Sequence, residues 1–270
     1  MKSNENSKDT SSDLITTRRE GHVLWIGFNR PKERNAFNTE MLIALSDAYT
    51  LLDRDPELRC GVVYAEGKQF TLGLDLPDVS ATMRDQGRVP LPEGNLDPWG
   101  VRGPMRTTPI VVASHGMCIT LGIELMLAAD IRLCAPRSAF GQIEVQRGLL
   151  PFGGATTRFP ALSGWGNAMR YILTGDTFDE NEALRIGLVQ EIVEKAELKN
   201  RAFELATRVA EQAPLGVQAS IEMARVAEQQ GAEAAGKLLQ AKALELMETE
   251  DAHEGVQSFI EKRKPVYRGK

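Results

Sequence analysis

Two glutamates lie among apolar neighbours, where a carboxylate would be out of place on an ordinary surface. Glu124 lies in the run Leu-Gly-Ile-Glu-Leu-Met-Leu-Ala-Ala, and Glu144 lies in Phe-Gly-Gln-Ile-Glu-Val. Apolar surroundings raise the pKa of a glutamate from about 4.3 toward neutrality. A general acid or base working near pH 7 needs such a pKa. We therefore predict that both residues act in acid–base chemistry; the alternative for each is a salt-bridged or exposed acid on an amphipathic element.

Two glycine-containing turns could supply backbone N–H groups to the same chemistry. Gly73 lies in Phe-Thr-Leu-Gly-Leu-Asp, and Gly122 lies in Thr-Leu-Gly just before the apolar run that holds Glu124. Such turns expose N–H groups, and a helix N-terminus adds its dipole. Two N–H groups that converge on one oxygen form an oxyanion hole, in which each donor contributes about 2.7–4 kcal/mol in the transition state. Either motif alone is more typical of an ordinary turn.

The elements that position these residues alternate between strands and helices. A hairpin is predicted over 14–19 and 22–28, and Asn38 is placed to cap a helix with apolar residues at helical spacing. Continuous apolar runs indicate strands buried on both faces of a parallel sheet, at 61–65, 110–113 and 131–135. From Asp179 onward the chain reads as nearly all helix, with Pro214 opening one of these helices. The fold class predicted is α/β with a helical C-terminal third.

The segment from Ser80 to Met105 does not fit this alternation. It is rich in Pro and Gly, which predicts a long loop, and such loops inside compact domains often form lids or pocket walls. Disorder is the alternative, and Trp99 within the segment favours a pocket wall.

Composition limits the classes of partner. The 270 residues are 42% hydrophobic and 26% charged with a net charge of −5, which argues against a nucleic-acid partner. The longest apolar runs are far too short to cross a membrane. Three cysteines without metal-ligand spacing predict buried free thiols in a reducing compartment. Residues 1–13 are polar and predict a disordered tail without a targeting signal, so we expect a cytoplasmic protein. No metal-binding cluster emerges.

The order of the motifs resembles the crotonase-like superfamily, the enoyl-CoA hydratases and isomerases, over about residues 15–269. The matching stretches, in chain order, are 29–36 (Asn-Arg-Pro-Lys-Glu-Arg-Asn-Ala), 67–75, 122–130, 140–154, 173–176, 182–189 and 261–265. The resemblance implies a spiral of ββα units over 14–195 and a helical region over 196–270 that forms trimers, usually paired into hexamers. It also implies a lyase of the kind found in fatty acid metabolism. No separate cofactor is expected, since coenzyme A is part of the substrate.

The resemblance assigns roles to particular positions. Glu124 and Glu144 would clamp a water that adds across the C2=C3 bond of an enoyl thioester, with Glu124 deprotonating the water and Glu144 exchanging the proton at C2. The N–H groups of Leu74 and Leu121 would hold the thioester oxygen as the enolate develops. The coenzyme A moiety would lie along one further group of residues, with the last near the nucleotide end: Lys32, Arg34, Leu72, Asp75, Leu76 and Lys262.

Several positions depart from the family pattern around the acyl group. Leu121 and Thr120 both stand where glycine is common, and Ile143 replaces a proline before Glu144. We expect backbone strain at Leu121, because leucine adopts a positive φ only at a cost. Phe152 and Ala155 replace glycines in a turn, so Phe152 and Leu121 are predicted to narrow the acyl pocket near C2 and C3. Trp99 would limit the length of the acyl chain.

Two alternatives to hydration or its reverse remain. The same scaffold supports isomerisation and other thioester reactions, which share the oxyanion hole and differ in their acid–base residues. The other alternative is a non-catalytic protein that binds coenzyme A esters. In such a protein the substitutions in the turns would prevent the oxyanion hole from forming. The retention of both glutamates favours hydration, because a binding module gains nothing from two acids in apolar surroundings.

Overall fold

The computed structural model describes residues 14–270, so the predicted disordered tail lies outside the described residues. The strands are β1 Ile15–Glu20, β2 Val23–Phe28, β3 Cys60–Ala65, β4 Ile110–Ser114, β5 Met117–Ile119, β6 Ile131–Cys134, β7 Ala139–Gly141, β8 Thr177–Asp179 and β9 Glu191–Ile192. The α-helices are α1 Thr39–Arg54, α2 Leu76–Gln86, α3 Leu121–Ala128, α4 Ala155–Ser163, α5 Trp165–Thr174, α6 Glu180–Arg185, α7 Lys195–Ala210, α8 Pro214–Gln230, α9 Ala232–Met247 and α10 Glu250–Glu261. Two short 3-10 helices are η1 Pro31–Glu33 and η2 Glu144–Arg147.

A six-stranded sheet in the order β1-β2-β3-β4-β6-β9 forms the centre of the core. The predicted hairpin is confirmed, since β1 pairs antiparallel with β2, and the three apolar runs form the parallel strands β3, β4 and β6. The short strand β9 was not predicted and interrupts the expected C-terminal helices by pairing with β6. A three-stranded sheet, β5-β7-β8, contacts α3 through β5.

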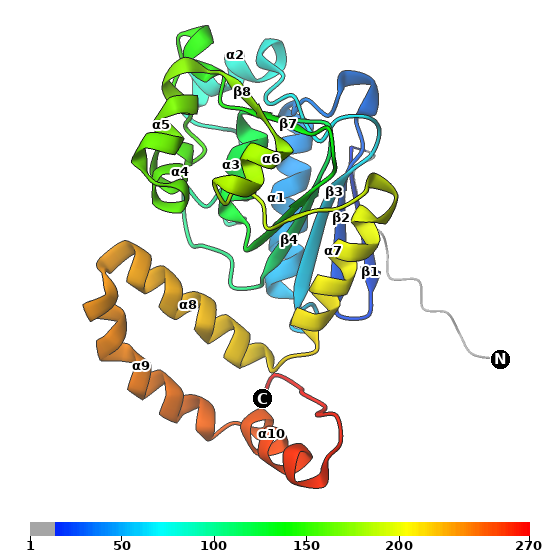
Figure 1. Cartoon of the computed structure of the whole chain (residues 1–270), viewed down its shortest axis with the longest axis vertical. Helices are drawn as coiled ribbons and strands as arrows, with labels where there is room; N and C mark the ends of the chain where they lie inside the picture. The colour runs from blue at the N-terminus through cyan, green and yellow to red at the C-terminus, as the bar shows by residue number, and fades with distance from the viewer. Residues whose placement is uncertain (1–13) are drawn as a thin grey trace, which may run out of the picture.

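Helices cover both faces of the main sheet (Figure 1). Asn38 caps α1 as predicted, because its side chain accepts a hydrogen bond from the Met41 N–H. The buried face of α1 packs into one apolar cluster, whereas α7 contributes Leu198, Ala202 and two further alanines to a second cluster with β3 and β4. The boundary expected after residue 195 therefore falls at the start of a core helix. We propose that the core continues to the end of α7.

The Pro/Gly-rich segment is partly helical, which corrects the prediction of a loop over 80–105. Pro77 lies in the first turn of α2, where its missing N–H costs nothing, and Val79 is buried. Gly87 ends the helix in the left-handed conformation with φ 64°. The remainder, residues 88–105, is an ordered connection without helix or strand.

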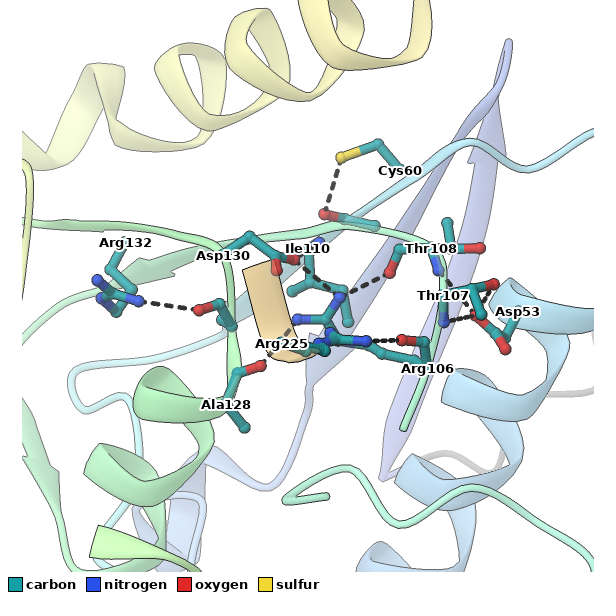
Figure 2. Close-up of polar contacts among 12 residues, drawn as sticks. Asp53, Cys60, Arg106, Thr107, Thr108, Ile110, Ala128, Asp130, Arg132 and Arg225 are labelled. Atoms are coloured by element: carbon teal, nitrogen blue, oxygen red, sulfur yellow. Dashed lines mark hydrogen bonds and ion pairs between the residues drawn. The ribbon is translucent and has the colours of Figure 1, made fainter. Parts of the chain in front are cut away.

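The last three helices extend from the core as an arm (Figure 1). A buried polar cluster fastens α8 to the core, and Figure 2 shows it. The Arg225 guanidinium of α8 donates to the Arg106 carbonyl oxygen. Arg106 in turn pairs with Asp130 at 2.8 Å and donates to the Ala128 carbonyl at the end of α3, also at 2.8 Å. The helix that carries Glu124 is thus anchored at its far end.

Two sequence expectations about the chain as a whole can be compared with this fold. All three cysteines are free and buried, as predicted. Within residues 14–270, no helix is both long and apolar enough to cross a membrane.

Candidate active site

A cavity of about 280 Å³ opens between α3, the end of α2 and the segment that follows it. Both glycine turns and one of the two glutamates contribute to its wall, as do all three residues predicted to shape the acyl pocket. The residues that line this cavity include Leu74, Trp99, Leu121, Glu124, Phe152 and Gly153.

The two N–H groups predicted to form an oxyanion hole are both free to bind a ligand. Leu121 is the first residue of α3, where an N–H has no partner within the helix. Leu74 lies between Gly73, whose carbonyl accepts from Phe37, and Asp75, whose N–H donates back to Phe37. Within the described part of the chain, neither the Leu74 nor the Leu121 N–H has a hydrogen-bond acceptor. Both residues line the same cavity, so an oxyanion there would find two unused donors.

The strain expected at Leu121 lies instead one residue earlier. Thr120 adopts φ 52° and ψ −120°, a conformation that a β-branched residue takes only at a cost of about 1–3 kcal/mol. Its hydroxyl packs so closely on Gly73 that a Cβ there would lie 2.0 Å from the Thr120 Oγ1. Gly73 is therefore required by contact as well as by its φ of 91°. The two turns hold each other in place, while Leu121 keeps a regular helical start.

Glu124 is held by the next helix along the chain rather than by a basic residue in contact. Its Oε1 accepts from the Gly153 N–H at 2.7 Å and from the Ala155 N–H at 3.2 Å, at the start of α4. Burial raises the pKa of Glu124 to about 7, against the effect of these donors and of nearby Arg158. Gly153 has no room for a side chain, since a Cβ there would lie 2.5 Å from the Glu124 Oε2.

Glu144 begins η2 and is 7% exposed. Burial and, to a smaller extent, the charge of Glu124 raise the pKa of Glu144 to about 7, so the two carboxyls are electrostatic neighbours. Gln142 is fully buried and faces this carboxylate. With its amide oriented to satisfy both groups, the Gln142 Nε2 donates to the two Glu144 oxygens at 2.8 and 2.9 Å. Glu144 itself is not among the residues that line the cavity.

Two acids that titrate near neutrality suit proton transfer at pH 7. Because two like charges close together repel each other, the pair favours the state in which one carboxyl is protonated and the other is ionised. The ionised member can take a proton from water and the neutral member can give one. With two free N–H groups in the same region, the arrangement can stabilise an enolate while protons move at adjacent carbons.

Trp99 and Phe152, predicted to shape the acyl pocket, both lie on the wall of this cavity. Trp99 is 5% exposed, and its Nε1 donates to the Leu121 carbonyl at 2.9 Å, which ties residues 88–105 to the start of α3. Phe152 is 38% exposed and lies beside Gly153, so it is not a core residue.

Five of the residues predicted to bind coenzyme A lie in the loop that holds η1 and in the segment that leads into and starts α2. Asn35 joins these two segments, because its Nδ2 donates to the carbonyls of Glu66 and Gln69 at 2.9 and 2.8 Å. Asp75 is held by Arg30 at 2.8 Å. The five are exposed or half-buried and do not line the cavity: Lys32, Arg34, Leu72, Asp75 and Leu76.

Lys262 is not brought to this region within one chain. It caps the end of α10, which lies at the opposite end of the molecule from α2 and α3 (Figure 1).

Sequence reasoning missed the residues that hold the glutamates. Gln142 precedes Glu144 by two positions, a spacing that places side chains on one face of an extended segment and could have drawn attention to it. Arg158 donates to the carbonyls of Trp99 and Gly100 at 2.7 and 2.9 Å, and its positive charge acts to lower the pKa of Glu124. Nothing in the local sequence indicates that Arg158 or Gly153 would approach Glu124.

This fold and this arrangement of buried acids beside free amides define the class of crotonase-like enzymes of acyl-CoA chemistry. The sequence model described as Enoyl-CoA hydratase/isomerase matches residues 18–270. The chain belongs to that family, and the resemblance, the fold class and the enoyl-CoA hydratase-like type of enzyme predicted from the sequence are confirmed.

Named relatives and solved structures are similar along nearly the whole chain. An enoyl-CoA hydratase of Mycobacterium tuberculosis is 30% identical over 97% of this chain and 98% of its own. A carnitinyl-CoA dehydratase of Salmonella paratyphi A is 31% identical over 96% of this chain and 100% of its own. The crystal structure of a probable enoyl-CoA hydratase/isomerase from Mycobacterium abscessus superposes with a TM-score of 0.92 at 48% identity, covering 95% of this chain and 99% of that one.

Proposed function

We propose that this enzyme hydrates enoyl-CoA thioesters, or dehydrates the 3-hydroxyacyl product in reverse. The observation that carries the proposal is a buried glutamate, Glu124, that lines the same cavity as two free N–H groups and has a second buried glutamate, Glu144, as its electrostatic neighbour; the pKa of each is raised. A protein that only bound coenzyme A esters would gain nothing from keeping two acids buried at this cost.

The reaction follows from the environment of each group. Glu124, whose carboxylate accepts two N–H bonds, is the ionised member and takes a proton from water as the oxygen bonds to C3. The electrons of the C2=C3 bond move toward the thioester, and the N–H groups of Leu74 and Leu121 stabilise the enolate oxygen. Glu144, in its protonated form, then gives its proton to C2.

Hydration is tested with a panel of enoyl-CoA thioesters of different chain length. Loss of the absorbance of the conjugated double bond measures addition of water, and identification of the 3-hydroxyacyl product distinguishes it from isomerisation. A product with a moved double bond and no added oxygen would assign the enzyme to isomerisation instead. Tight binding of every thioester with no turnover would identify a binding protein.

A further inference from the structure

The cavity that would hold the acyl group has an unusual charge on its wall. Beside its apolar residues it is lined by Arg88, Arg102 and Asp97, which all come from the segment that follows α2. A pocket for a plain hydrocarbon chain gains nothing from two arginines, because a cation near an apolar ligand loses hydration without a compensating partner.

Asp97 offsets only one of these two positive charges, and its carboxylate oxygens are also hydrogen-bonded to the backbone. Its Oδ1 accepts from the Trp99 N–H at 3.0 Å, and its Oδ2 accepts from the N–H groups of Val101 and Arg102 at 3.1 and 3.0 Å. Asp97 therefore shapes the turn that places Trp99 and Arg102.

Arg102 is only loosely paired. Its Nε lies 3.8 Å from the Asp97 Oδ2, beyond hydrogen-bond distance, and its Nη1 donates to the Val89 carbonyl at 3.1 Å. Its Nη2 has no acceptor among residues 14–270. The side chain is 37% exposed and is held by one hydrogen bond to the backbone. It therefore keeps N–H donors free for a ligand.

Arg88 directly follows the glycine that ends α2 and is exposed at the cavity. Within the described residues it has no ion-pair or hydrogen-bond partner. Two arginines thus face one aspartate on this part of the wall, which leaves one positive charge in excess there. The residues expected to bind coenzyme A lie on other loops and do not line this cavity, so the excess positive charge is directed at the acyl end of the substrate.

We propose that Arg88 and Arg102 recognise a carboxylate at the far end of the acyl chain, so that the preferred substrates are coenzyme A monothioesters of unsaturated dicarboxylic acids. The inference rests on the proposed function of this site. A guanidinium with free N–H groups is the side chain best suited to bind a carboxylate. The same charges disfavour an acyl chain that ends in a quaternary ammonium group.

The test compares substrates of matched length and different terminal charge: glutaconyl-CoA, neutral pent-2-enoyl-CoA and cationic crotonobetainyl-CoA. We expect kcat/KM to be about fivefold to tenfold higher for glutaconyl-CoA than for pent-2-enoyl-CoA, the scale of a partly exposed ion pair. The cationic thioester should be the poorest of the three. Added salt should weaken the preference, because it screens exposed charges.

Substitution of each arginine tests whether these side chains cause the preference for a terminal carboxylate. Arg102→Gln and Arg88→Gln should each lower the ratio of kcat/KM for glutaconyl-CoA over pent-2-enoyl-CoA severalfold. Arg84→Gln is the matched control, since Arg84 is an exposed arginine of α2 that does not line the cavity, and it should leave the ratio as it is. Equal use of the anionic and neutral thioesters by the native enzyme, at any salt concentration, would overturn the proposal while leaving hydration intact.

If no thioester is turned over, the proposed function fails, and binding then decides the carboxylate preference separately. Calorimetric titration with glutaryl-CoA and valeryl-CoA should show the tighter Kd for the former. Equal Kd values would overturn the proposal in that case also.

Discussion

The two glutamates are buried to a similar degree, but different groups surround them. Glu124 faces the first N–H groups of α4, whereas Glu144 faces the neutral amide of Gln142. A helix N-terminus favours the ionised form more strongly than one amide does. This difference supports Glu124 as the base and Glu144 as the acid in the direction of hydration.

Removing either carboxylate should therefore remove one proton transfer. Glu124→Gln and Glu144→Gln are each expected to lower kcat for a hydrated thioester by about a hundredfold or more, the scale of lost acid–base assistance. Steady-state kinetics measures kcat for each variant, and circular dichroism checks that the variant is folded. Glu40→Gln, an exposed acid on α1, is the matched control. Native turnover in either active-site variant would exclude that residue from catalysis.

The same substitutions should affect stability in a direction set by pH. Because both pKa values rise from 4.5 to about 7 on folding, the folded chain holds protons that the unfolded chain has released. The free energy of unfolding therefore falls as pH increases from about 4.5 to 7, by roughly 3 kcal/mol for each group taken alone. We expect either Gln variant to gain Tm relative to the native protein at about pH 8, and the gain to shrink toward about pH 5. A gain that did not depend on pH would contradict the raised pKa values.

We expect Gln142 to influence the pKa of Glu144. Its donation favours the ionised form of Glu144, so Gln142→Leu should raise the pKa of this carboxyl further. If Glu144 must be protonated, the alkaline limb of the kcat/KM profile should move to higher pH. Because the two glutamates titrate as a coupled pair, each limb of the pH profile reports on both of them. The pH profile of Glu124→Asp, measured in the Gln142→Leu background, is the reference. A general loss of activity with unmoved limbs would show that Gln142 is only structural.

At the scale of elements, the cavity is assembled where three segments meet. Residues 88–105 are joined to the start of α3 by the Trp99 hydrogen bond and to α4 by Arg158, while the turn before α4 carries Phe152. A change in this turn therefore alters the wall of the cavity more than the core.

Phe152→Gly should widen the acyl pocket. We expect kcat/KM for bulkier or branched thioesters to rise relative to crotonyl-CoA, since each methylene that a pocket accepts or excludes is worth about 1–3 kcal/mol. Because Phe152 is 38% exposed, the loss in stability should be well below the roughly 3–5 kcal/mol of a core phenylalanine. Leu150→Gly, at a more exposed position of the same turn, is the control. An unchanged selectivity profile with a large drop in Tm would mean that Phe152 acts through packing.

At the scale of the whole molecule, the C-terminal arm exposes more apolar surface than an isolated chain should. Helices α9 and α10 and the tail after them carry large apolar side chains that are about half to four-fifths exposed: Leu238, Leu239, Leu244, Met247, Val256, Phe259, Ile260 and Val266. This surface, and the distance of Lys262 from its own cavity, favour an assembly in which the arm reaches a neighbouring copy.

We expect a trimer or hexamer in solution. Light scattering at micromolar protein concentration measures the mass, and Phe259→Glu should shift it toward smaller species by placing charge in the contact. Lys262→Ala should raise KM for the thioester only in the assembled form. A native protein that ran as a monomer would refute the expectation.

The sequence by itself determined the hairpin, the apolar strands of the main sheet, the helix starts at Asn38 and Pro214, and which acids stand among apolar neighbours. Continuous apolar runs are enough to specify parallel strands, and Asn38 and Pro214 start helices through interactions within a few residues. The unusual neighbours of Glu124 and Glu144 were visible because an acid in an apolar run is a local feature. The order of the motifs carried the rest of the family assignment.

Only the tertiary structure decided what surrounds the acids. Glu124 receives hydrogen bonds from residues about thirty positions later, and Leu121 receives one from Trp99, because the spiral brings separate turns into contact. Backbone strain settled on Thr120 rather than Leu121, since α3 begins one residue after the turn. Arg102 lies on the cavity wall in a turn that Asp97 shapes by accepting the N–H groups of Val101 and Arg102. No periodicity in the sequence encodes these contacts, because they depend on how distant segments pack.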